Sequence, residues 1–333
     1  MNDRNRRLVL AQRPTEMIDD TIVQVQEDDA PTAGPGQALA RVRYLSIDPT
    51  IRTWMDDAPG YLPPIAIGDV VRSGGIAEIV ESNSPAYAPG ELVFGLTGWQ
   101  DWVLADEGAM RKLPPGLEPT TALGVLGSTG MTAYFGLLDV GRVQEGDAVV
   151  VSAAAGATGS TVGQIARIKG ASPVVGIAGS HEKCAWLVDE LGFDTAINYK
   201  TESVGRALHE ACPNGIDLYF DNVGGEILDT CLGQLAMRGR VVLCGAIASY
   251  NDRAKRTGPA NYISLLVRRG RMEGFIILDY LDRFPEAQAE MAGWLAAGEI
   301  KSAEHIVDGL ENAPAALNLL FTGGNTGKVI VRL

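Results

Sequence analysis

Between about residue 123 and residue 300, short apolar runs alternate with longer stretches of helical periodicity. The apolar runs predict strands at 148–152, 174–177, 196–198, 218–220, 241–244 and 274–278. The stretches between them predict helices, for example at 160–169, 182–191, 225–237 and 283–297. Strands joined through helices lie parallel in one sheet that is covered on both faces. This region therefore predicts an α/β fold with a six-stranded parallel sheet, the size of a complete dinucleotide-binding sheet.

The first 120 or so residues have a different pattern, in which short β-prone runs are separated by glycine and proline. The runs lie at 38–44, 74–81, 91–95 and 101–105, and helical periodicity is scarce. Such a pattern favours a compact β-barrel-like domain. A chain of 333 residues has room for two domains, one of each kind.

The charge balance restricts the class of partner. Lysine and arginine number 28 against 41 aspartates and glutamates, so the net charge is −13. An acidic protein repels phosphate backbones and anionic lipid, and we therefore expect no nucleic-acid or membrane partner. No apolar stretch is long enough to span a bilayer.

Four cysteines lie at irregular spacings in the second half of the chain: Cys184, Cys212, Cys231 and Cys244. This usage suits reduced thiols better than a disulfide framework. The first residues lack the apolar core of a secretion signal. We therefore expect a cytoplasmic protein.

The sharpest local motif runs from Val149 to Ser160, Val-Val-Val-Ser-Ala-Ala-Ala-Gly-Ala-Thr-Gly-Ser. A buried strand here enters a turn of small residues that opens a helix. Gly156 and Gly159 let the backbone approach a pyrophosphate, and the helix N-terminus offers N–H groups to it. Ala154 stands where the common G-x-G-x-x-G pattern has its first glycine. A tight turn without a ligand is the alternative interpretation.

The next strand indicates which nucleotide binds. An NAD site usually has an acidic residue at the end of this strand, which binds the ribose 2′-hydroxyl. Gly179 stands in this region instead, followed by Ser180 and Lys183. Ser180 can donate a hydrogen bond to a 2′-phosphate and Lys183 can pair with it. The motif therefore favours NADPH/NADP+ over NADH, although Lys183 alone could be an ordinary surface lysine.

A zinc site is not expected. A catalytic zinc site needs a thiolate in the first domain together with further cysteine, histidine or carboxylate ligands. Residues 1–180 contain neither cysteine nor histidine. The three histidines, His181, His209 and His305, lie far apart in sequence. We therefore expect no metal ligands among the site residues.

Segments throughout the chain resemble one family. They lie at 45–49 (Leu-Ser-Ile-Asp-Pro), 90–95, 98–101, 126–127, 130–138, 153–160, 182–184, 198–200, 219–225 (Tyr-Phe-Asp-Asn-Val-Gly-Gly), 244–247, 250–251 and 309–314. The chain resembles the zinc-free branch of the medium-chain dehydrogenase/reductase superfamily, specifically the leukotriene B4 12-hydroxydehydrogenase/prostaglandin reductase and curcumin reductase family. One departure is Thr50, where the family commonly has tyrosine.

The resemblance implies a fold and a cofactor site. Residues 1–122 and 301–333 would form a β-rich GroES-like barrel domain that binds substrate, and residues 123–300 a Rossmann dinucleotide-binding domain. The cofactor-binding residues would be Gly156, Ala157, Thr158, Gly159, Ser180, Lys183, Tyr199, Asn222, Cys244, Gly245, Ala246, Ile247, Tyr250, Phe275, Ile276, Ile277 and Asn325. A homodimer formed through the edge of the nucleotide-binding sheet is the family expectation.

The resemblance also implies the reaction. NADPH would reduce the C=C bond of an α,β-unsaturated ketone or aldehyde by hydride transfer to the β-carbon. Hydrogen-bond donors would stabilise the enolate that develops, with Tyr250 as the first candidate and Tyr61 as the second. Two alternatives stay open: an NADPH-dependent quinone reductase, and a nucleotide-binding protein without turnover.

Overall fold

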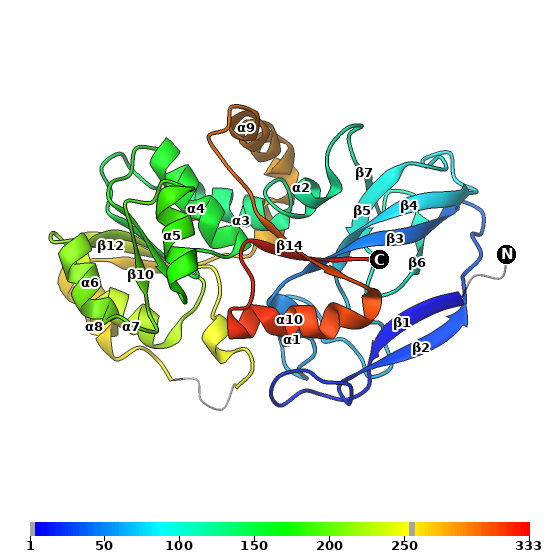
Figure 1. Cartoon of the computed structure of the whole chain (residues 1–333), viewed down its shortest axis with the longest axis horizontal. Coiled ribbons are helices and arrows are strands. Elements are labelled where there is room, and N and C mark those ends of the chain that lie inside the picture. Colours follow the sequence, from blue (N-terminus) through cyan, green and yellow to red (C-terminus); the bar gives the residue numbers. More distant parts are fainter. Residues whose placement is uncertain (1–3, 253–256) are drawn as a thin grey trace. The chain divides into compact units, whose positions relative to one another are not determined.

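The structure is a computed structural model that describes residues 4–252 and 257–333. The chain forms two compact units. One comprises Met1–Leu123 together with Glu304–Leu333, and the other comprises Gly124–Ala303. The two units share no sheet, and each is described separately below (Figure 1).

The unit Gly124–Ala303 is built on a six-stranded parallel sheet with the order β10-β9-β8-β11-β12-β13. The strands are β8 (Val149–Ser152), β9 (Val174–Ala178), β10 (Thr195–Asn198), β11 (Ile216–Asp221), β12 (Leu235–Leu243) and β13 (Arg271–Gly274). The chain order reverses between β8 and β11, which is the place where dinucleotide-binding sheets open a crevice for their ligand. The predicted α/β class and the six-stranded sheet are confirmed.

Helices cover this sheet (Figure 1). They are α3 (Ser128–Phe135), α4 (Ala157–Ile168), α5 (His181–Asp189), α6 (Val204–Ala211), α7 (Gly225–Gly233), α8 (Ile263–Arg268) and α9 (Phe284–Ala296). Helices α6, α7 and α8 enclose one apolar core with the strands, to which Val150, Tyr219 and Leu232 contribute. Helix α4 contacts β8 and β9 and buries most of its length. A rigid sheet of this kind fixes the loops at its strand ends.

Several element boundaries differ from the sequence prediction, and the strand expected at 241–244 begins six residues earlier, at Leu235. The helix expected at 225–237 ends at Gly233, because Leu235 already pairs with Ile216 as the first residue of β12. The strand expected at 274–278 lies instead at Arg271–Gly274, and the apolar residues after it lead into the 3-10 helix η5 (Ile277–Arg283). An edge strand pairs on one side only, so it needs no continuous apolar run.

The other unit contains a seven-stranded mixed sheet and a two-stranded sheet. Its strands are β1 (Arg4–Leu10), β2 (Val23–Asp29), β3 (Gln37–Ile47), β4 (Gly74–Ser82), β5 (Leu92–Leu96), β6 (Trp102–Asp106), β7 (Arg111–Lys112), β14 (Glu304–Asp308) and β15 (Lys328–Arg332). Its helices include α1 (Thr50–Trp54), α2 (Pro119–Leu123) and α10 (Ala313–Thr322). Strand β15 pairs antiparallel with β3, so the end of the chain belongs to this sheet.

The pair β1–β2 was not predicted from the sequence. Its outer half carries charges instead of an apolar alternation, and cross-strand ion pairs join the two strands. Arg4 Nη1 lies 2.9 Å from Asp29 Oδ1, and Arg7 pairs with Asp28. Only the inner end, which includes Leu8 and Leu10, enters the apolar core of the unit. The stretch of apolar residues is therefore too short to predict these strands from the sequence.

Candidate cofactor site

The carboxyl ends of the six parallel strands carry nearly all of the predicted cofactor residues. The predicted segments are 156–159 after β8, Ser180 and Lys183 after β9, Tyr199 after β10, Asn222 after β11, 244–247 after β12 and 275–277 after β13. Parallel strands present their carboxyl ends at one edge of the sheet. The unit Gly124–Ala303 therefore gathers these segments at one edge.

The turn after β8 fits a diphosphate group. Gly156 is the N-cap of α4, and no side chain caps this helix. The first N–H groups of α4 are therefore left to an external acceptor. A Cβ on Gly159 would lie only 2.4 Å from Ala153 O, so only glycine allows the helix to start this close to the turn. Ala153 in this turn has left-handed backbone (φ 46°), a conformation that glycine adopts more readily than alanine.

The ends of β9 and β10 form a basic site. A Cβ on Gly179 would lie 3.0 Å from Tyr199 Cε1, so the Tyr199 ring lies against this glycine. Lys200 Nζ lies 6.0 Å from the centre of that ring. Burial lowers the pKa of the half-buried Lys183, and the neighbouring charge of Lys200 lowers it further. Two neighbouring ammonium groups raise the local positive potential, so this is a candidate site for an anion.

Two details at this basic site were not predicted. The first is that Lys200 lies at this site. Its position next to Tyr199, just after the end of β10, could have predicted this from the sequence. Ser180 Oγ accepts the N–H of Lys183 at 3.3 Å and so caps α5. The Ser180 hydroxyl also lowers the pKa of the exposed Glu182 carboxyl, after the larger effect of the Glu182 backbone N–H. Ser180 would have to release Glu182 before it could donate to a phosphate.

The ends of β8, β11 and β12 are joined by hydrogen bonds. Asn222 Nδ2 donates to Ser152 O at 2.8 Å, and Asn222 O accepts the Ile247 N–H at 3.3 Å. Burial, with a further contribution from the Asp221 charge, raises the pKa of the Cys244 thiol to about 12. Cys244 is therefore a neutral thiol near pH 7 and not a nucleophile. Sequence reasoning overlooked Ser152 and Asp221, because both lie at the ends of buried strands.

Tyr250 follows the 3-10 helix η2 (Ile247–Ser249) and turns back toward the end of β12. Its hydroxyl oxygen lies 3.2 Å from Ala246 N and accepts that N–H. A Cβ on Gly245 would also lie 3.2 Å from this oxygen. A phenol that accepts one hydrogen bond keeps the chemical capacity to donate its own proton. The structure therefore places the Tyr250 hydroxyl over the 244–246 backbone.

Phe275 lies on the apolar side of the β13 end. A Cβ on Gly136 would lie 2.6 Å from Phe275 Cζ, and the rings of Phe275 and Tyr280 meet edge to face at 6.3 Å. Ile276 is extended and precedes η5, which begins at Ile277. The segment 275–277 thus runs over the end of the sheet, with the Phe275 ring packed against Gly136.

Two predicted site residues belong to the other unit. Tyr61 is 46% exposed, and its hydroxyl lies 2.5 Å from Thr50 Oγ1. Thr50, which departs from the family pattern, thus holds the second candidate tyrosine. Asn325 is 7% exposed, and its Nδ2 donates to Gly327 O at 3.0 Å. A cofactor contact of Asn325 stays a prediction.

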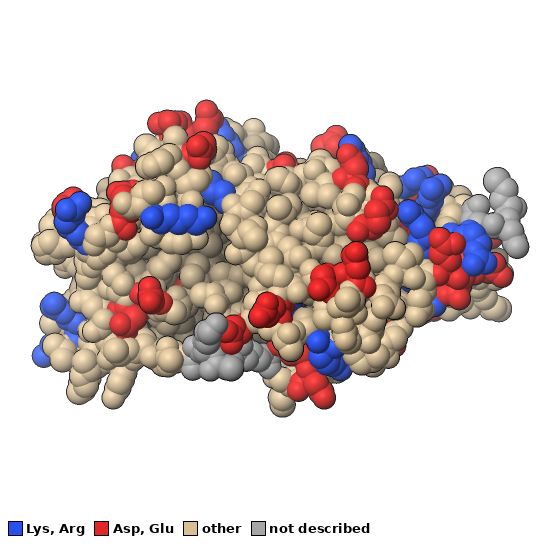
Figure 2. Space-filling view, turned by 60° about the horizontal axis from the view of Figure 1, so that its bottom comes forward, with Lys and Arg blue, Asp and Glu red and all other residues tan. Residues whose placement is uncertain are grey.

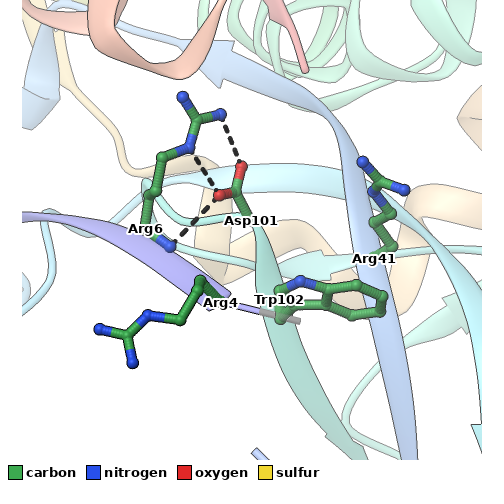
Figure 3. A pocket seen from close by; sticks show the side chains of 5 residues that line it. All are labelled: Arg4, Arg6, Arg41, Asp101 and Trp102. Carbon is green, nitrogen blue, oxygen red and sulfur yellow. Dashed lines mark hydrogen bonds and ion pairs between the residues drawn. The ribbon is translucent and has the colours of Figure 1, made fainter. Parts of the chain in front are cut away.

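A surface hollow of about 230 Å³ lies in the same unit as Tyr61 and is lined by Arg4, Arg6, Arg41, Asp101 and Trp102 (Figure 3). Its arginines already have partners. Arg6 forms a bidentate pair with Asp101, at 2.8 and 3.1 Å, and Arg4 pairs with Asp29. The Arg41 guanidinium lies 5.6 Å from the centre of the Trp102 ring. We interpret the side chains around the hollow as structural, because they join β1 to the start of β6.

Within residues 4–252 and 257–333, no group of three or more His, Cys, Asp or Glu side chains could hold a metal ion. Nor does any helix in the described part of the chain have the length and apolarity to cross a membrane. On the face drawn in Figure 2, basic and acidic side chains of the described residues are interspersed. That face therefore presents no broad basic field.

Two sequence families match the chain. Residues 6–113 match a family described as N-terminal domain of oxidoreductase, and residues 157–293 match one described as zinc-binding dehydrogenase. The NADPH-dependent curcumin reductase of Escherichia coli is 44% identical, over 99% of this chain and 97% of that protein. Prostaglandin reductase 1 of Rattus norvegicus is 40% identical, over 94% of each chain.

A solved structure is similar over nearly the whole chain. It is that of CurA from Vibrio vulnificus in complex with NADPH, with 43% identity, a TM-score of 0.94 and 98% of each chain covered. The fold and the site thus define an oxidoreductase of the medium-chain dehydrogenase/reductase superfamily. Within that superfamily the chain belongs to the zinc-free family of the prostaglandin and curcumin reductases.

Proposed function

We propose that the protein is an NADPH-dependent reductase of the C=C bond of α,β-unsaturated ketones and aldehydes. The observation that carries the proposal is the basic site at the ends of β9 and β10, where the charges of Lys183 and Lys200 interact and the Tyr199 ring lies against Gly179. The relatives support it, since they are named NADPH-dependent curcumin reductase and prostaglandin reductase. The unit Gly124–Ala303 would bind the cofactor, and the other unit would supply substrate contacts.

The strand ends supply a binding group for each part of the dinucleotide. The first N–H groups of α4, at Ala157 and Thr158, would hold the diphosphate. Lys183 and Lys200 would pair with the 2′-phosphate, with the Tyr199 ring beside them. The segments that follow β11, β12 and β13 would line the nicotinamide half. Asn325 is proposed to contact the cofactor from the other unit.

The bound cofactor would supply a hydride to the β-carbon of the substrate, and the π electrons of the C=C bond would shift toward the carbonyl oxygen, which leaves a C–C single bond. Negative charge then develops on the carbonyl oxygen. The Tyr250 hydroxyl would donate a hydrogen bond to that oxygen, directly or through the ribose 2′-hydroxyl, and Tyr61 is the second candidate donor. A proton from water would complete the α-carbon. The product is the saturated carbonyl compound.

Mixing the purified protein with NADPH and a panel of enals, enones and quinones tests this function. We expect NADPH absorbance to fall with enals and enones, and the products to be saturated aldehydes and ketones. Faster oxidation by quinones than by any enone would instead support the quinone reductase. Tight NADPH binding without oxidation by any compound would indicate a nucleotide-binding protein without turnover.

We propose further that the protein is a homodimer formed through the β13 edge. Among the described residues, β13 pairs only with β12, so its outer side offers unpaired N–H and C=O groups. The neighbouring α8 exposes apolar side chains, including Leu266 at 73% and Val267 at 61%. An antiparallel contact centred on Met272 would place Arg271 of each copy opposite Glu273 of the other. A self-complementary patch of this kind suits a two-fold dimer.

Leu266→Asp should convert this dimer to monomer, because it would place two charges in the apolar interface. We expect light scattering to give twice 35.3 kDa for the parent protein and 35.3 kDa for the variant. Ile306→Asp, at another exposed apolar position that lies in β14, is the matched control and should remain dimeric. A monomeric parent protein would rule the proposal out.

The location we propose is the cytoplasm. Cys184, Cys212, Cys231 and Cys244 are all free thiols, which suits a reducing compartment. Cell fractionation with an antibody to the protein would check this location, and recovery outside the cytoplasmic fraction would contradict it.

A further inference from the structure

One buried carboxylate has no part in the function proposed above. Asp221, the last residue of β11, is 0% exposed. Among residues 4–252 and 257–333 no opposite charge contributes to its pKa, and its Oδ2 has no hydrogen-bond partner. A charge buried without a counter-ion is costly, so its other contacts must stabilise it.

The second oxygen of Asp221 supplies that stabilisation. Oδ1 accepts hydrogen bonds from the Tyr219 hydroxyl at 2.8 Å and from the Ser152 hydroxyl at 3.1 Å. It also accepts the N–H groups of Val223 and Gly224, each at 2.9 Å. Four donors on one oxygen favour the ionised carboxylate over the protonated acid. Burial is the largest effect and raises the pKa of Asp221 above its ordinary value, and these bonds lower it only in part.

The same residue fixes the backbone at three strand ends. The N–H groups that it accepts hold the turn leading to Gly224, which is the N-cap of α7 and has a φ of 72° that favours glycine. Its main-chain oxygen accepts the N–H groups of Cys244 at 2.9 Å and Gly245 at 3.0 Å, at the end of β12. Ser152 Oγ, at the end of β8, in turn accepts the Asn222 N–H at 2.9 Å. Asp221 therefore connects β8, β11 and β12 at the edge where the cofactor residues lie.

The charge of Asp221 extends beyond these contacts. It contributes to the raised pKa of the Cys244 thiol, which lies in the segment proposed to line the nicotinamide half. Charges act over longer distances in a buried environment than in water. The nicotinamide ring is neutral in NADPH and carries a positive charge in NADP+. A fixed negative charge near these strand ends would therefore stabilise the positively charged nicotinamide ring of NADP+ more than the neutral ring of NADPH.

We propose that Asp221 is a positioning residue that fixes the 222–225 turn and, through its charge, stabilises bound NADP+ relative to bound NADPH. The reaction converts NADPH to NADP+, so the same charge favours the loss of hydride. This inference rests on the proposed cofactor site. It assigns Asp221 no contact with substrate.

Asp221→Asn tests the charge separately from the geometry. Asparagine keeps an acceptor at Oδ1 and places its amide nitrogen where Oδ2 has no partner, so the turn should persist. We expect the ratio of the dissociation constants, NADP+ over NADPH, to rise roughly tenfold, as expected for the loss of one unscreened charge. Calorimetric titration with each nucleotide measures this ratio without turnover. Asp189→Asn, on the exposed end of α5, removes the same charge elsewhere and should leave the ratio unchanged.

The outcomes separate this inference from the proposed function. A parent protein that binds neither nucleotide would overturn both. If Asp221→Asn weakens both nucleotides by the same factor, or changes neither, the charge effect is refuted while the cofactor site stands. Should Asp221→Asn fail to fold, Asp221→Ser, which keeps a small acceptor without charge, must give the same rise in the ratio.

Discussion

Replacing Lys183 and Lys200 together with alanine should weaken NADPH binding on the order of 100-fold and leave NADH binding nearly unchanged. Each lysine contributes a charge-assisted contact to the 2′-phosphate, which NADH lacks. Lys183, half-buried at the start of α5, should contribute more than the exposed Lys200. Titration of cofactor fluorescence with each nucleotide measures the two affinities.

A double variant with the same change of net charge provides the control. Lys112 pairs with Glu91 and Lys301 pairs with Glu190, both on exposed surface. Lys112→Ala with Lys301→Ala should therefore bind NADPH as the parent does. An equal loss of NADPH and NADH affinity in the first variant would show that its lysines support the fold and do not read the phosphate.

Tyr250→Phe should lower kcat for an enone about 100-fold, the loss typical when one donor to a developing oxyanion is removed. The ring remains, so NADPH should still bind with an affinity within a few-fold of the parent. Steady-state kinetics together with a cofactor titration give both quantities. Tyr61→Phe, at the second candidate donor, should have a smaller effect.

The surface tyrosine Tyr262 is the matched control, because it is 62% exposed. Tyr262→Phe should turn over enones at the parent rate. The Tyr250 hydroxyl also accepts the Ala246 N–H, so its alternative role is to hold the backbone that binds the cofactor. If Tyr250→Phe loses NADPH affinity as much as it loses kcat, the hydroxyl serves only to hold that backbone.

The nucleotide-binding sheet could be predicted from the sequence because its inner strands are buried on both faces. Strands such as β8 and β9 are therefore continuous apolar runs. Edge positions lack this signal. The edge strand β13 is charged and was predicted three residues late, and the pair β1–β2 depends on ion pairs that no apolar period reveals. In each case pairing with a neighbour sets the boundary.

The candidate site shows the same division. The turn at Gly156 and Gly159 was predicted, since a strand, small residues and a helix follow one another directly. Lys200 and Asp221 were not, because their roles depend on contacts between elements distant in sequence. Asp221 accepts a hydrogen bond from the Ser152 hydroxyl, and the two residues are 69 positions apart in the sequence. Such hydrogen bonds follow from the strand order, which the sequence pattern does not specify.

The central claim is that hydride passes from NADPH to the β-carbon of an enone. The most direct measurement uses NADPH deuterated at the transferable position of C4, followed by magnetic resonance of the product. We predict one deuterium on the β-carbon and an intact carbonyl group. An alcohol with deuterium on the carbon that bears the hydroxyl group, or a product without deuterium, would contradict this account.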